Sequence, residues 1–263
     1  MNNWEAIILG IVQGTSEFLP ISSSGHLEIA KVLMGNAFLP SESLLMTIVL
    51  HGATALSTLY VFRKDILAIL KGLMVLEWNP SWRFALWVVL SMLPAAFVGL
   101  FFEAQIAALF SGNLILVGLL LLVTAALLFF ADRAGRTAQA LNTKSALVIG
   151  LAQCIAILPG LSRSGATIGT ALLLKIERSE AARFSFLMVI PLILGSMAKS
   201  IMDLEDSTVS VNYLPLGLGF ISAFITGVLA CQWMIALVKR SKLTYFSLYC
   251  SLVGLIALIY GLR

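Results

Sequence analysis

The chain has 263 residues, of which 60% are hydrophobic and 11% are charged, and its mean hydropathy is +1.00. These values lie far outside the range of soluble globular domains and exclude that class. The formal net charge of +4 is better explained by basic loops at a membrane surface than by nucleic-acid binding. We therefore expect an all-α polytopic membrane protein.

Six apolar segments are long enough to cross a membrane as helices, since about 20 residues span the hydrocarbon core. These segments are 43–62, 84–102, 112–131, 183–202, 214–238 and 244–262. Two further apolar regions, 4–34 and 145–175, are each interrupted by a proline and by small polar residues. Each half of an interrupted region is too short to span alone. We expect a re-entrant helical hairpin in each, with one kinked span as the alternative.

The distribution of basic residues favours the hairpins. If both regions are hairpins and loop 63–83 is cytoplasmic, 13 of the 17 Lys and Arg residues lie in the cytoplasm. Only Lys31, Lys199 and Arg263 then lie outside, and Arg163 falls at the second interruption. An excess of Lys and Arg on the cytoplasmic side is the usual bias of membrane proteins. The first hairpin is therefore predicted to enter from the outer side.

An internal repeat relates the two halves of a single membrane domain, 1–263. Repeat one covers 1–133 and repeat two covers 141–263. An offset of 140 residues separates five matched pairs: Gly10 and Gly150, Gln13 and Gln153, Ser22 and Ser162, Ser24 and Ser164, and Gly25 and Gly165. Each half then holds one hairpin and three spans, and because three is odd, the second half is inserted upside down. Inverted repeats bring broken helices together at the membrane midplane, where charged substrates bind.

The first interruption, GIVQGTSEFLPISSSGH at 10–26, carries groups that are expensive to bury in a membrane. Pro20 cannot continue a smooth helix, because proline has no backbone N–H. Glu17 and His26 form an ionisable pair at bilayer depth, which usually marks a functional site. The three serines between them offer hydroxyl groups, one of which is a candidate nucleophile.

The second interruption, LPGLSRSGAT at 158–167, supplies a cation. Arg163 can bind a phosphate through two parallel hydrogen bonds, and a membrane-buried arginine needs an anion. A half-helix is predicted to restart after each interruption, with serines in the N-cap position before Gly25 and Gly165, and such helix N-termini suit phosphate. Together the two tips predict a phosphoryl-transfer site, with a hydroxyl nucleophile, a base and cationic donors.

These two motifs resemble the signature of the bacterial undecaprenyl-diphosphate phosphatases, also called the bacitracin-resistance family. The resemblance extends over the whole chain and includes FSFLMVIPLILG at 184–195. It implies a multi-pass hydrolase of the bacterial inner membrane that converts undecaprenyl diphosphate to undecaprenyl phosphate and inorganic phosphate. Such an enzyme recycles the lipid carrier for peptidoglycan synthesis and confers bacitracin resistance. The resemblance also implies an outward-facing site and a divalent cation, Mg or Ca. A homodimer is the alternative to a monomer.

The resemblance assigns roles to residues of this sequence. Ser23 is the nucleophile, His26 accepts or donates a proton, and Glu17 orients His26 or holds the metal. Gln13 fills the first position of the family's E/Q-x-x-x-E motif, which leaves the metal site with one carboxylate. The residues expected to bind the diphosphate are Arg163, Ser162, Ser164, Thr167, Ser22, Ser24 and Gly25. Spacing does not choose among the three serines, and a water activated by Glu17 or His26 is the alternative nucleophile.

A lipid-carrier flippase or anion transporter is the alternative function, because inverted repeats with broken helices are a transporter architecture. The enzyme is favoured, since a transporter has less use for Ser23 beside His26 and Glu17. His51 is predicted to be a packing residue, with a place in the cavity wall as the alternative. Three glycines, Gly99, Gly118 and Gly254, are predicted to allow close contact between helices.

Overall fold

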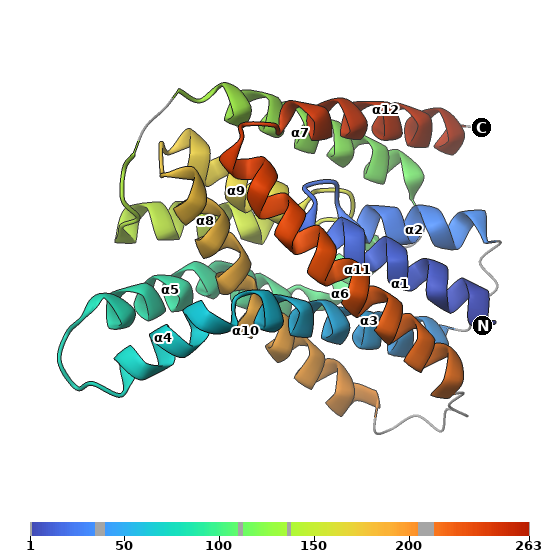
Figure 1. The fold of residues 1–263 in the computed structure, drawn as a ribbon. Coiled ribbons are helices and arrows are strands. Elements are labelled where there is room, and N and C mark those ends of the chain that lie inside the picture. Colours follow the sequence, from blue (N-terminus) through green and yellow to red (C-terminus); the bar gives the residue numbers. More distant parts are fainter. Residues whose placement is uncertain (1, 35–39, 110–112, 136–137, 205–212, 263) are drawn as a thin grey trace.

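The computed structural model describes residues 2–34, 40–109, 113–135, 138–204 and 213–262 (Figure 1). Within these residues the chain forms twelve helices and no strand, which confirms the all-α prediction. The helices are α1 Asn3–Phe18, α2 Ser23–Leu33, α3 Pro40–Val61, α4 Arg63–Leu73, α5 Pro80–Phe101, α6 Glu103–Leu109, α7 Leu114–Arg133, α8 Thr143–Ile155, α9 Arg163–Leu173, α10 Arg178–Leu204, α11 Tyr213–Lys239 and α12 Thr244–Gly261.

Six of these helices are long and apolar enough to cross a membrane, namely α3, α5, α7, α10, α11 and α12. They coincide with the six segments that the sequence predicts as spans, and the largest difference in bounds is at α10, which begins at Arg178 rather than at 183. A hydropathy window misses this first turn because it is charged. α5 begins at Pro80 because the Asn79 side chain accepts hydrogen bonds from the backbone N–H groups of Ser81 and Trp82.

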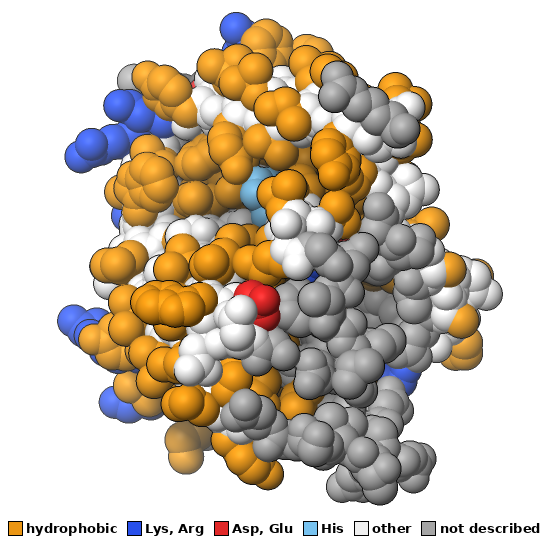
Figure 2. Space-filling view, turned by 90° about the vertical axis from the view of Figure 1, so that its right-hand side faces the viewer, with side chains coloured by type: hydrophobic (Ala, Val, Ile, Leu, Met, Phe, Trp, Pro, Cys, Tyr) orange, Lys and Arg blue, Asp and Glu red, His pale blue; other side chains and the backbone are white. Residues whose placement is uncertain are grey.

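Large apolar side chains cover the outside of the bundle. Leu119 on α7, Leu229 on α11 and Ile256 on α12 are 50%, 62% and 65% exposed. Figure 2 shows hydrophobic side chains over much of one face. Contiguous apolar surface of this extent is not stable against water. With six candidate spans, the chain is a multi-pass membrane protein whose outer surface faces lipid.

The two interrupted regions each form a helix, a break and a second helix. α1 ends at Phe18 and α2 begins at Ser23, with Pro20 between them. α8 ends at Ile155 and α9 begins at Arg163. In Figure 1, α1 and α2 lie on the same side as both chain termini, α8 and α9 lie on the opposite side, and the breaks lie between the two pairs.

The two breaks touch at the centre of the molecule. The Ser164 hydroxyl donates to the carbonyl oxygen of Leu19 at 3.2 Å. A Cβ atom added to Gly25 would lie 3.1 Å from the Cα atom of Gly160. Gly160 itself has φ +98°, a conformation that L side chains rarely adopt. The backbones of the two breaks can approach this closely because neither residue carries a side chain.

Glycines also set several helix crossings. A Cβ on Gly118 of α7 would lie 2.7 Å from the carbonyl oxygen of Gly254 on α12, and a Cβ on Gly254 would lie 2.9 Å from that of Gly118. These two glycines confirm the predicted close contact. The prediction for Gly99 was wrong, because a Cβ there meets no atom of the described residues within 4 Å. Gly99 instead lines a cavity.

Candidate active site

The first polar tip brings a serine hydroxyl onto a carboxylate. Ser22 caps α2 and accepts a hydrogen bond from the backbone N–H of Gly25 at 3.2 Å. This cap makes Ser23 the first residue of α2, and its hydroxyl donates to Oε2 of Glu17 at 2.6 Å. One turn earlier on α1, the Gln13 side-chain amide donates to the same oxygen at 3.1 Å. Ser23 and Glu17 therefore form a hydrogen-bonded pair across the first break.

The second polar tip adds the guanidinium of Arg163. Ser162 caps α9 and accepts from the backbone N–H of Gly165 at 3.1 Å. The backbone N–H of Ser162 donates to the Thr124 hydroxyl on α7 at 3.1 Å, which fixes the start of α9. From there, Nη1 of Arg163 reaches to 3.6 Å from Oε1 of Glu17. The Glu17 side chain is 7% exposed, and a carboxylate buried this far needs the partners it has.

A cavity of about 380 Å³ opens beside this cluster, a volume typical of ligand sites. Ser23 and Ser24 from the first tip and Arg163 from the second tip line it. Its other polar wall residues come from four helices: Glu28, Lys31, Thr47, His51, Gln153, Ser196 and Ser200. The cavity therefore presents a hydroxyl and a guanidinium to a single bound molecule.

The remaining predicted residues have other positions. Glu17, Ser164 and Thr167 border a small chamber of about 20 Å³, and Arg163 borders both this chamber and the larger cavity. Ser22 and Ser162 use their hydroxyls as helix caps, each with the backbone of a glycine three residues later. Serines were predicted at both N-cap positions, and the structure assigns this role to Ser22 and Ser162.

His26 faces away from the cavity. Its Nε2 atom lies 2.8 Å from the Tyr249 hydroxyl on α12, and its ring stacks on the Tyr249 ring at a centroid distance of 5.6 Å. Its Nδ1 atom lies 2.8 Å from the carbonyl oxygen of Ser22. Both ring nitrogens are thus occupied, and His26 is absent from the residues that line the cavity. His26 was expected to accept or donate a proton beside Ser23, but its side chain does not line the cavity that Ser23 lines.

None of the seven polar wall residues named above was predicted as a site residue, and two of them, His51 and Gln153, lie where they bear on the chemistry of the site. His51 on α3 lines the cavity and lies close enough to Glu17 to interact with its charge. Its Nδ1 atom lies 2.8 Å from the carbonyl oxygen of Thr47. Gln153 on α8 also lines the cavity. The sequence held one signal for Gln153, its repeat relation to Gln13, whereas a lone histidine in an apolar span carries little information.

The cluster offers few protein ligands for a metal ion. Among the described residues there is no group of three or more His, Cys, Asp or Glu side chains that could hold one. One observation does point to a cation: Oε1 of Gln13 is buried and has no hydrogen-bond partner in the described part of the chain. One carboxylate and one amide oxygen fit only an ion that takes its other ligands from phosphate and water, as Mg²⁺ commonly does.

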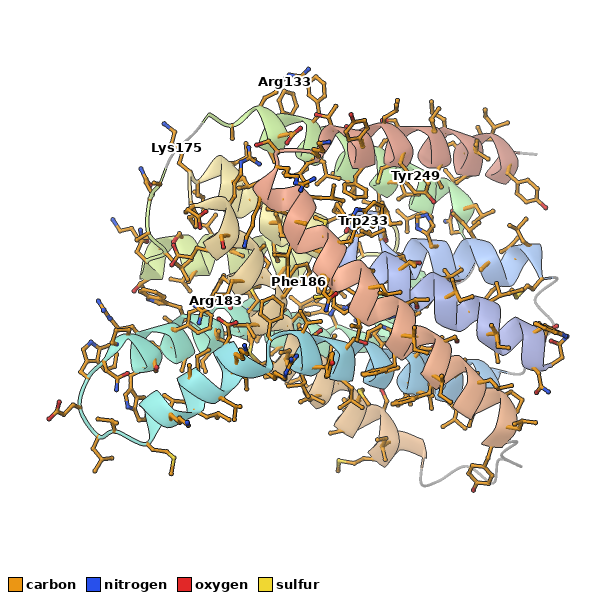
Figure 3. The ribbon with its side chains drawn as sticks, in the orientation of Figure 1. Arg133, Lys175, Arg183, Phe186, Trp233 and Tyr249 are labelled. Atoms are coloured by element: carbon orange, nitrogen blue, oxygen red, sulfur yellow. The ribbon has the colours of Figure 1, made fainter. Side chains whose placement is uncertain are left out.

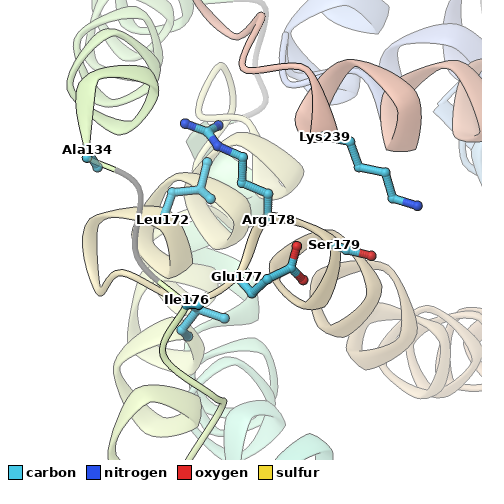
Figure 4. Close-up of a pocket in the computed structure, with 9 residues that line it drawn as sticks. Ala134, Leu172, Ile176, Glu177, Arg178, Ser179 and Lys239 are labelled. Atoms are coloured by element: carbon cyan, nitrogen blue, oxygen red, sulfur yellow. The ribbon is translucent and has the colours of Figure 1, made fainter.

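A second cavity, of about 490 Å³, lies where α7, α9 and α11 end and α10 begins (Figure 4). Arg178 and Lys239 contribute positive charge to its wall, and Glu177 contributes negative charge. Asp132 lies 3.9 Å from Arg178 and forms a loose ion pair with it. No residue of the two polar tips lines this cavity. The smaller cavity beside Ser23 is therefore the candidate active site.

The fold and the site define a class: a polytopic helical membrane protein in which two interrupted helical regions bring together a serine, a buried carboxylate and a partly exposed guanidinium. The sequence model of the family described as "Bacitracin resistance protein BacA" matches residues 6–256, and the chain belongs to this family. The predicted resemblance is thereby confirmed.

Several relatives cover nearly the whole chain. A protein of Christiangramia forsetii is 54% identical over 99% of both chains. One of Bacteroides fragilis is 46% identical over 98% of both chains. One of Methanobrevibacter smithii is 35% identical over 96% of this chain and 95% of its own length. All three are named "Undecaprenyl-diphosphatase".

Proposed function

We propose that this protein is an integral-membrane phosphatase that hydrolyses undecaprenyl diphosphate to undecaprenyl phosphate and inorganic phosphate. The names of its full-length relatives support this function. The observation that carries it is the hydrogen bond of 2.6 Å from Ser23 to Glu17 at the wall of a cavity that Arg163 also lines. In the cell this reaction returns the lipid carrier to peptidoglycan synthesis and contributes to bacitracin resistance.

In the first chemical step, the Ser23 oxygen attacks the terminal phosphorus of the diphosphate. The new bond joins this oxygen to phosphorus, and the bond from phosphorus to the bridging oxygen breaks. Glu17 takes the serine proton and passes it to the departing undecaprenyl phosphate, as a positioned general base and then acid. Arg163 stabilises the charge on the phosphoryl oxygens, and its loose contact of 3.6 Å with Glu17 leaves its donors available.

In the second step, water hydrolyses the phosphoserine. Glu17 accepts a proton from the water, whose oxygen bonds to phosphorus while the bond to the Ser23 oxygen breaks. The proton returns to Ser23, and inorganic phosphate leaves. Direct attack by a water held at Glu17 is the alternative to the phosphoserine, and both routes use Glu17 and Arg163 in the same roles.

A divalent cation, Mg²⁺ or Ca²⁺, is part of the proposal. Glu17 and the unpaired Oε1 atom of Gln13 would hold it together with the diphosphate. When bound, it supplies positive charge that offsets the charge of the phosphate oxygens. The other expected diphosphate ligands, Ser24, Ser162, Ser164 and Thr167, lie at or behind the same wall.

His26 receives a different role in this proposal. Because its ring nitrogens contact Tyr249 and Ser22, we assign it to positioning the first turn of α2. This turn carries Ser23, so a shift of His26 would move the nucleophile relative to Glu17. Proton transfer then rests on Glu17, which already accepts the Ser23 hydrogen bond.

We also propose that the two interrupted regions are re-entrant hairpins of an inverted repeat. The packing supports this arrangement, because α1 packs on α11 and its counterpart α8 packs on α5, each the second span of the other half. The corresponding pairs α3 with α10 and α7 with α12 also pack together. A Cβ on Gly10 would lie 2.5 Å from a carbonyl oxygen of α11, and one on Gly150 would lie 2.5 Å from a carbonyl oxygen of α5.

The cavity is proposed to open to the outer side. Its wall includes Lys31 near the end of α2, Leu44 near the start of α3, Gly99 near the end of α5 and Ser200 near the end of α10. All four positions belong to the side that the basic residues predict to be external. A lipid diphosphate in the outer leaflet would therefore reach Ser23 directly.

The proposal is tested by phosphate release from a long-chain isoprenyl diphosphate by the purified protein, with and without a chelator. We expect release by the unchanged protein, loss on chelation, and a fall of more than about a hundredfold in both Ser23→Ala and Glu17→Gln. Release that persists in Ser23→Ala but not in Glu17→Gln assigns the nucleophile to water. No release by folded, unchanged protein contradicts the phosphatase function.

A further inference from the structure

The proposed mechanism leaves one buried polar side chain of the cavity unused. Gln153 on α8 is 1% exposed, and neither its Nε2 nor its Oε1 atom has a hydrogen-bond partner in the described part of the chain. Buried amides are almost always hydrogen-bonded, and an unpaired one is costly. Because Gln153 also lines the cavity that Ser23 and Arg163 line, its missing partner is expected to be a ligand.

The repeat explains why this amide is unpaired. In the first half, Gln13 donates to Glu17, one helical turn later, at 3.1 Å. The residue one turn after Gln153 is Ile157, which is apolar and also lines the cavity. The two glutamines thus hold equivalent positions in the repeat but differ in their hydrogen bonds. Repeat two lacks the carboxylate that would accept a hydrogen bond from the Gln153 amide.

We propose that Gln153 binds the phosphate that remains with the lipid, and so selects a diphosphate over a monophosphate. This inference rests on the proposed phosphatase function. Ser23 and Arg163 are assigned to the terminal phosphoryl group, and Gln153 forms no hydrogen bond with either of them. Its Nε2 group donates to an oxygen of the second phosphate, and its Oε1 atom accepts from a protonated phosphate oxygen.

The position of Gln153 suits a specificity residue. α8 packs against both α5 and α9, so the amide is carried by a rigid helix rather than by a loop. A site built to hydrogen-bond a group discriminates strongly against an analogue without that group, because the amide is then left unpaired. A ligand with a single phosphate fills the Ser23 and Arg163 subsite only, and leaves Gln153 without a partner.

The test compares two competitive inhibitors of Gln153→Met, an unbranched substitution of similar length. Inhibition constants are measured for methylenediphosphonate, which has two phosphorus centres, and for inorganic phosphate, which has one. We expect the constant for the diphosphonate to rise about tenfold or more and that for phosphate to stay within about twofold. The matched control is Gln232→Met on the exposed side of α11, which should change neither constant.

Equal changes in the two constants, or no change, would overturn the inference. If Gln153→Met does not fold, Gln153→Glu keeps the size of the side chain and replaces the amide donor by a carboxylate. Charge repulsion should then weaken the diphosphonate at least tenfold, and unchanged binding by this variant overturns the inference equally. Binding is also followed by the shift in unfolding temperature that each inhibitor causes. An inactive wild-type protein that still binds diphosphonate contradicts the phosphatase function and not this site.

Discussion

At the scale of single residues, Glu17 connects the two polar tips. Its Oε2 atom accepts hydrogen bonds from Ser23 and Gln13, and its Oε1 atom faces Arg163. In this arrangement the Glu17 carboxylate can accept the proton of the Ser23 hydroxyl. The Arg163 guanidinium can leave Glu17 and bind a phosphate instead. The sequence predicted that these residue types would converge, because the repeat brings the two breaks together.

His26 and Tyr249 allow a prediction about positioning. If the Tyr249 hydroxyl holds His26, then Tyr249→Phe and His26→Ala should lower phosphate release by a similar factor of about ten or less. The double variant should fall little further, because the two changes remove one shared contact. The measurement is the rate of phosphate release by the two single variants and the double variant, with unfolding temperatures as the control for folding.

If His26 instead transfers a proton, the two single variants should differ in their rates of phosphate release. His26→Ala alone would then fall by a factor of about 10² to 10⁴, and Tyr249→Phe would remain near the unchanged protein. Independent effects of that size would contradict the positioning role.

At the scale of elements, glycine decides how closely the helices approach. The Cβ of an alanine at Gly150 would lie 2.5 Å from the carbonyl oxygen of Ser91 on α5. Backbone cannot give way as a flexible side chain does, so the two helices would have to separate. Because α8 carries Gln153 at the cavity wall, this crossing also sets the position of that amide.

The crossing is tested by Gly150→Ala. We expect a loss of about 1–3 kcal/mol in the free energy of unfolding, the usual cost of overpacking. Gly217→Ala on α11 is the matched control, because a Cβ there meets no atom within 4 Å in the part of the chain that the structure describes. That change should be neutral or stabilising by about 0.5–1 kcal/mol, since alanine favours a helix. Equal destabilisation by both variants, in denaturant unfolding in detergent, would argue against a tight crossing.

At the scale of the whole molecule, charge and shape agree on an orientation. Figure 3 shows Arg133, Lys175 and Arg183 in the left-hand half of the view, away from both chain termini. Helices α1 and α2 lie on the side of the termini (Figure 1). If the basic half lies in the cytoplasm, as we propose, the cavity beside Ser23 opens to the outer side.

The orientation is tested with a single cysteine at Ser24, which lines the cavity. The native Cys154, Cys231 and Cys250, which are free thiols, are replaced by alanine. An impermeant thiol reagent should label Ser24→Cys in intact cells, whereas the control Lys242→Cys, in the predicted cytoplasmic loop, should be labelled only after lysis. Labelling of Ser24→Cys only in broken cells would place the cavity on the inner side.

The sequence by itself determined the class, the six spans and the two breaks. These follow from local features: about 20 apolar residues span a bilayer, and proline or a capping serine ends or begins a helix wherever it stands. The convergence of Glu17, Ser23 and Arg163 was also predictable. Two matching motifs in an internal repeat indicate that the two breaks meet, although they lie far apart in the sequence.

Only the tertiary structure decided which side chains face the cavity. His26 turns to Tyr249, which is 223 positions away in sequence, and no spacing within one motif contains that contact. His51 and Gln153 face the cavity because of how α3 and α8 are rotated against their neighbours. The rotation of a helix about its axis depends on packing over the whole bundle. The apolar pattern of the sequence does not specify this rotation, because a membrane helix is apolar both where it faces lipid and where it faces other helices.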